Sequence, residues 1–73
     1  MDNRDMLRMA NQIAGFFNGS GKEAAVKDAA EHINKFWDPR MRAALIRYLD
    51  AGGAELDPTI REAATLIRRP QAA

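Results

Sequence analysis

Hydrophobic residues recur along this chain with the period of an α-helix, and no segment shows the strict alternation of a half-buried strand. We therefore expect helices over about residues 3–17, 21–36, 39–51 and 58–68. The first of these has its apolar residues on one face: Met6, Met9, Ala10, Ile13, Phe16 and Phe17. The prediction is an all-α fold, a small bundle of about four short helices, forming one domain over residues 1–73 with residues 70–73 as a frayed tail.

The other three segments have apolar faces of the same kind. The second face consists of Val26, Ala29, Ala30, Ile33 and Trp37, with Phe36 at its margin. The third consists of Met41, Ala44, Leu45, Tyr48 and Leu49, and the fourth of Ile60, Ala63, Ala64 and Ile67. These residues are the predicted core.

Start and stop signals separate the predicted helices. Asp38-Pro39 and Asp57-Pro58 each place a good N-cap before a proline that suits the first helical position. Asp2 or Asn3 can cap the first helix. The turn-forming sequence from Asn18 to Gly21 ends that helix. Ser20 and Glu23 have the spacing of a capping box. Gly52-Gly53 predicts that the third helix ends at a glycine with the left-handed backbone conformation.

Composition narrows the classes of function. The 73 residues include no cysteine and one histidine, which excludes disulfides and thiolate metal sites. A core this small supplies little net stability, so we expect a partner protein to add some. The net charge of +1 is a weak footprint for nucleic acid. No apolar run is long enough to span a membrane and no secretory signal begins the chain, so the cytoplasm is the expected compartment.

Catalysis and phosphate binding have little support. Ser20 is expected to act as a helix cap, and His32 lies on a helix without an obvious nucleophile beside it. The sequence NGSGKE has glycines and a lysine before a helix, but it lacks the spacing of a phosphate-binding loop. We expect no catalytic residue, no metal site and no cofactor in this chain.

The segment HINKFWDPRMR concentrates unusual residues at one helix corner. Phe36 and Trp37 either fill the small core or form an interaction hot spot. Arg40 and Arg42 lie near the start of a helix, where positive charge opposes the helix dipole without evident compensation. The hypothesis is a partner interface made of His32, Phe36, Trp37, Arg40 and Arg42. On this hypothesis, replacing both arginines by Gln weakens a complex and leaves the isolated fold intact.

The same segment resembles the small delta subunit of soluble, NAD-dependent, molybdenum-containing formate dehydrogenases. The opening MANQIAGFF is similar to that family's first helix, and Gly52-Gly53, Leu56 and Asp57-Pro58 are similar to its third helix exit. The resemblance is strongest at His32, Ile33, Phe36, Trp37, Asp38, Pro39, Arg40, Met41 and Arg42.

The resemblance implies an accessory protein that assists assembly, cofactor maturation or stability of the complex. In that family the alpha subunit carries a molybdenum pterin and iron–sulfur clusters, and the beta and gamma subunits pass electrons to flavin and NAD. The alpha subunit is then the first expected partner, followed by beta and gamma. Two other hypotheses remain: a helical domain that forms a homodimer through the Met/Phe face of residues 3–17, and a small nucleic-acid-binding module.

Overall fold

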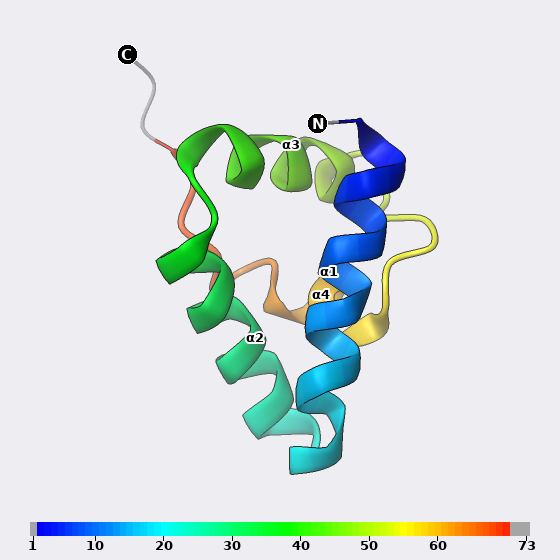
Figure 1. Cartoon of the computed structure of the whole chain (residues 1–73), viewed down its shortest axis with the longest axis vertical. Coiled ribbons are helices and arrows are strands. Elements are labelled where there is room, and N and C mark those ends of the chain that lie inside the picture. Colours follow the sequence, from blue (N-terminus) through cyan, green and yellow to red (C-terminus); the bar gives the residue numbers. More distant parts are fainter. Residues whose placement is uncertain (1, 71–73) are drawn as a thin grey trace.

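The computed structural model describes residues 2–70, and this part of the chain is helical without strands. Its elements are α1 (Asn3–Phe17), a 3₁₀ turn η1 (Asn18–Ser20), α2 (Lys22–Phe36), α3 (Pro39–Asp50) and α4 (Pro58–Ala63). In Figure 1, α1 and α2 form an antiparallel hairpin, α3 crosses its open end, and α4 lies behind the hairpin. The predicted all-α fold with four short helices is confirmed. The predicted tail begins at Pro70, and its remaining residues lie outside the described range.

Small residues form the contact between α1 and α2. Ala10 and Ala14 of α1 and Ala29 of α2 are fully buried, which lets two helix backbones approach closely. Larger side chains then fill the space between the hairpin and the other two helices. The largest fully buried ones are Met6, Ile33, Leu45 and Ile60, one from each helix. The core is therefore shared by all four helices.

Aspartate side chains cap three helices, as expected. Asp2 accepts a hydrogen bond from the backbone N–H of Asp5, and Asp38 accepts one from Met41 at 2.9 Å. Asp57 accepts one from the N–H of Thr59 at 2.9 Å. The predicted capping box of Ser20 and Glu23 is wrong, because Ser20 lies in η1 and Gly21 is the N-cap of α2 without a side-chain cap bond.

Gly53 provides the predicted exit from α3. Its φ is +64°, and its N–H donates to the carbonyl of Tyr48 at 3.0 Å. A Cβ at this position would lie 3.4 Å from the side chains of both Leu49 and Arg61. Glycine therefore suits position 53 for two reasons. The backbone there is left-handed, and a side chain would lie close to Leu49 and Arg61.

The fourth helix is shorter than predicted, since α4 ends at Ala63 and not at Arg68. The apolar spacing there was read correctly, because Ile60, Ala63 and Ile67 are all buried. Beyond Ala63 the backbone continues in turns, and the carbonyl of Leu66 and the N–H of Arg68 pair with the side chain of Asn34 in α2.

Three asparagines of the hairpin hold the C-terminal segment in place. The Asn34 side chain donates to Leu66 O at 2.9 Å and accepts from Arg68 N at 2.8 Å. Asn11 makes the same pair of bonds, donating to Glu55 O at 2.9 Å and accepting from Asp57 N at 2.8 Å. Asn18 donates to the Asp57 carboxylate and accepts from the Thr59 hydroxyl. The segment from Glu55 to Arg68 is therefore positioned by the hairpin.

Candidate protein-interaction surface

Trp37 lies in the core and not on the surface. Its side chain is only 4% exposed and belongs to the main buried cluster. The residue ends α2 with an extended backbone (φ −87°, ψ 131°), which turns the chain toward the Asp38-Pro39 start of α3. Of the two functions considered for this tryptophan, the structure supports the filling of a small core. The predicted interface residues that remain are His32, Phe36, Arg40 and Arg42.

Arg42 is half-buried and bonded to the backbone at two places. Its Nη1 donates to the carbonyl of Trp37 at 2.7 Å, and its Nε donates to the carbonyl of Arg68 at 3.2 Å. These bonds join the α2–α3 corner to the C-terminal segment and compensate for a cation near the start of α3. Replacing Arg42 together with Arg40 would therefore remove two bonds within the fold, so we expect that double substitution to lower the stability of the isolated chain as well.

His32 and Phe36 belong to a continuous row of rings across α1 and α2. The ring centroids of His32 and Phe36 are 4.8 Å apart, and those of Phe17 and His32 are 6.1 Å apart. Phe16 extends the row, with its ring 5.0 Å from that of Phe17. We call these four residues, Phe16, Phe17, His32 and Phe36, the aromatic row.

The aromatic row is strongly exposed at both ends. Phe16 is 80% exposed and Phe36 is 70% exposed, whereas Phe17 and His32 are half-buried. Contiguous apolar side chains on a surface are typical of sites that contact another molecule. Asp28, Glu31 and Lys35 lie beside the inner rings around a shallow hollow of about 190 Å³. Polar side chains thus border the rings, as at the rim of a protein interface.

The sequence placed Phe16 and Phe17 together in the core, and the structure corrects this for Phe16. Adjacent residues of a helix point about 100° apart, so two neighbouring phenylalanines do not both face one narrow core. That spacing was the available signal for an exposed ring. Met6 of the same helix is fully buried, so the methionine part of the face proposed for self-association packs within the chain.

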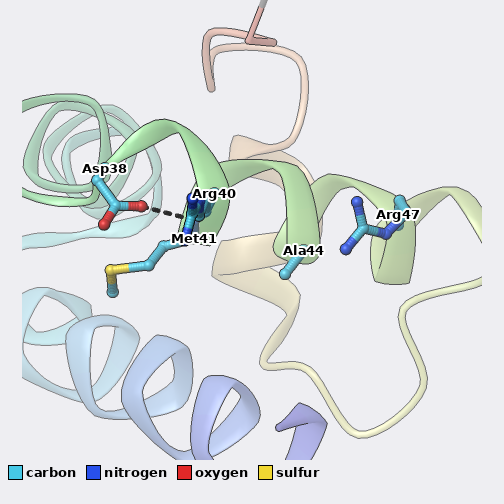
Figure 2. Close-up of a pocket in the computed structure, with 5 residues that line it drawn as sticks. All are labelled: Asp38, Arg40, Met41, Ala44 and Arg47. Carbon is cyan, nitrogen blue, oxygen red and sulfur yellow. Dashed lines mark hydrogen bonds between the residues drawn. The ribbon is translucent and has the colours of Figure 1, made fainter. Parts of the chain in front are cut away.

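Arg40 lies just after the corner between α2 and α3, and its side chain is at the surface of α3. It lines an open hollow of about 540 Å³ together with Asp38, Met41, Ala44 and Arg47. Figure 2 shows these side chains arranged along α3, with the Asp38 carboxylate directed to the backbone of Met41. The structure therefore separates Arg40, which is exposed, from Arg42, which is tied to the backbone.

No group of three or more His, Asp or Glu side chains in residues 2–70 is arranged to hold a metal ion. In the same range, no helix is long and apolar enough to cross a membrane.

The fold and its surfaces define a class: a small all-helical domain with exposed aromatic and basic side chains. Residues 5–64 match the family model described as "NADH-dependant formate dehydrogenase delta subunit FdsD". The match covers well over half of the 73 residues, so the chain belongs to this family. This confirms the resemblance carried by the segment HINKFWDPRMR. A comparison with individual curated proteins finds no match.

Proposed function

We propose that this chain is a non-catalytic accessory subunit of an NAD-dependent formate dehydrogenase complex. It acts by protein–protein contact in assembly, cofactor maturation or stabilisation of the complex. The observation that carries the proposal is the match of residues 5–64 to the delta-subunit family. The exposed rings of Phe16 and Phe36 support it, because they offer apolar surface to another protein.

The proposal assigns the chemistry to the partner subunits. The alpha subunit, which would carry the molybdenum pterin and iron–sulfur clusters, is the first partner to test, and the beta and gamma subunits with flavin and NAD follow. This chain would hold none of these groups. The cytoplasm is the compartment in which we expect the complex to form.

A capture experiment with separate subunits tests the proposal. The full chain carries an affinity tag and is mixed in turn with the alpha, beta and gamma subunits of the enzyme from the same organism. We expect retention of at least one of them, with alpha first. Failure to retain any subunit, singly or as the assembled enzyme, would contradict the proposal.

The aromatic row gives a sharper prediction about this contact. Replacing both Phe16 and Phe36 by Ser removes exposed apolar area without touching the core, because both rings are at least 70% exposed. We expect the complex to weaken by about tenfold or more, as for loss of an aromatic anchor. Unfolding temperatures of the isolated variants and affinities for the captured subunit are the measurements.

Leu66 supplies the matched control for that variant. It is another large apolar side chain at the surface, 50% exposed, and it comes from the C-terminal segment and not from the aromatic row. Leu66→Ser should leave the affinity unchanged. Equal losses in the two variants would show a general effect of surface hydrophobicity and would remove the aromatic row from the interface.

A further inference from the structure

Two arginines of α3 point to a charged partner. Arg40 and Arg47 are seven positions apart, which puts them on the same side of the helix about 10 Å apart along its axis. Both residues are exposed. Within residues 2–70, neither side chain makes a hydrogen bond or an ion pair, since the side-chain bonds of arginine there belong to Arg8, Arg42, Arg68 and Arg69.

The carboxylates at the two ends of α3 are already engaged. Asp38 accepts the N–H of Met41 as the helix cap. Asp50 binds Arg69 through both carboxylate oxygens, at 3.2 and 3.0 Å. Between these two acids, α3 therefore carries two arginines, Arg40 and Arg47, whose charge is not neutralised by a direct bond within the described chain.

An apolar floor lies between the two arginines. Met41 and Ala44 are half-buried and line the same hollow of about 540 Å³. Figure 2 shows Ala44 between the two arginine side chains along α3. This order of cation, apolar floor and cation is complementary to a segment that carries a negative charge, an apolar side chain and a second negative charge. We call Arg40, Met41, Ala44 and Arg47 the arginine face.

We infer that the arginine face binds an acidic amphipathic segment of a partner subunit. That segment would present two carboxylates about two helical turns apart, with an apolar side chain between them for the floor. A guanidinium group offers paired donors that match a carboxylate, so each arginine can bind one acid through two hydrogen bonds. The inference rests on the proposed function, because it names the chemistry of the partner in that complex.

An acidic protein segment fits this surface better than nucleic acid. The floor of Met41 and Ala44 is apolar and offers no hydrogen-bond donor to a phosphate lying between the two arginines. The whole chain has a net charge of only +1. Nucleic-acid surfaces usually concentrate much more positive charge on one face.

The experiment measures the affinity of the full chain for its captured subunit between about 0.05 and 0.3 M salt, where screening of charge pairs changes most. The test variant is Arg40→Gln with Arg47→Gln. The control is Arg4→Gln with Lys27→Gln, which removes two exposed cations from α1 and α2. A third variant, Arg40→Lys with Arg47→Lys, keeps the charge and removes the planar fork. Circular dichroism checks that all variants are folded.

We expect the Gln pair to weaken the complex about tenfold at low salt and to flatten its salt dependence. The control pair should behave as wild type, and the Lys pair should fall between them. An unchanged affinity of the Gln pair, with wild type still bound, would overturn this inference and leave the proposed function standing. Loss of the wild-type complex on nuclease treatment would also overturn it. No binding by wild type at any salt would overturn the proposed function and this inference together.

Discussion

At the scale of single residues, neighbouring arginines of one motif have different roles. Arg40 and Arg42 looked equivalent in the sequence, because both place a cation near the start of a helix. Arg42 reaches the carbonyls of Trp37 and Arg68, whereas Arg40 extends into solvent. One of these two contacts joins residues that are 26 positions apart in the chain. Local sequence does not contain this information.

The pair allows a direct test of the structural role of Arg42. Arg42→Gln loses two charge-assisted bonds to carbonyls and should lower the free energy of unfolding by about 1–2 kcal/mol. Arg40→Gln, two positions away, should change it by less than about 0.5 kcal/mol, as surface substitutions usually do. Urea denaturation of the isolated chain measures both. Equal stability of the two variants would show that the Arg42 bonds do not form in solution.

Asp50 and Arg69 form a second residue-scale pair, fully on the surface. The hydrogen bond from Arg69, and then its charge, hold the pKa of Asp50 below its ordinary value. A carboxyl whose pKa is lower in the folded state stabilises the fold above its unfolded pKa. That stabilisation is lost as the pH falls through the folded pKa.

The stability that this pair adds is therefore present near neutral pH and is lost in acid. Arg69→Gln should raise the pKa of Asp50 toward its usual range, as followed by an NMR titration of the carboxyl carbon. The gap in stability between wild type and this variant should close as the pH falls below that range. An Asp50 titration that is the same in both proteins would rule out the pair.

At the scale of elements, the ends of helices were predictable where the signal was local. The start of α1 after Asp2, the starts of α3 and α4 after Asp38 and Asp57, and the end of α3 before Gly53 all follow from residues next to the boundary. The end of α4 at Ala63 was not predicted, and the segment after it is bonded to Asn34 of α2, which lies more than 30 positions earlier in the chain. The roles of Asn11 and Asn18 were hidden in the same way, because their hydrogen-bond partners in the segment from Glu55 to Thr59 are distant in the sequence.

Asn34 gives the test at this scale. Asn34→Ala removes both bonds to the C-terminal segment and should cost about 1–3 kcal/mol of stability. In a domain of this size that lowers the unfolding temperature by several degrees, about 4–8 °C for each kcal/mol.

Asn3→Ala is the matched control for this substitution. Asn3 is exposed in the first turn of α1, and no side-chain hydrogen bond of it occurs within residues 2–70. Its replacement should leave the unfolding temperature nearly unchanged. A similar small effect at both sites would mean that Asn34 does not hold the C-terminal segment.

At the scale of the whole molecule, the apolar pattern predicted the fold class and most of the core. The pattern did not predict which aromatic side chains are exposed to solvent. Trp37 was weighed as a surface anchor and is buried, and Phe16 was placed in the core and is 80% exposed. Ring burial depends on how α1 and α2 pack against the other elements, which periodicity within one helix does not specify. The exposed surface follows from the assembled hairpin and its corner.

The aromatic row reaches the α2–α3 corner with Phe36 of α2, and the arginine face begins at the same corner with Arg40 of α3. A partner that contacts both would cover apolar rings and two cations with one continuous surface. On the proposed function, these exposed side chains would be covered by a partner subunit in the complex.

The most direct test of the account is the composition of the intact enzyme. Formate dehydrogenase is purified through a tag on the alpha subunit, and native mass spectrometry determines the subunits in its cofactor-loaded and cofactor-free forms. The account predicts this chain in a fixed ratio in the loaded enzyme if it is a permanent subunit, or only in the cofactor-free form if it serves maturation. Its absence from both forms would contradict the account.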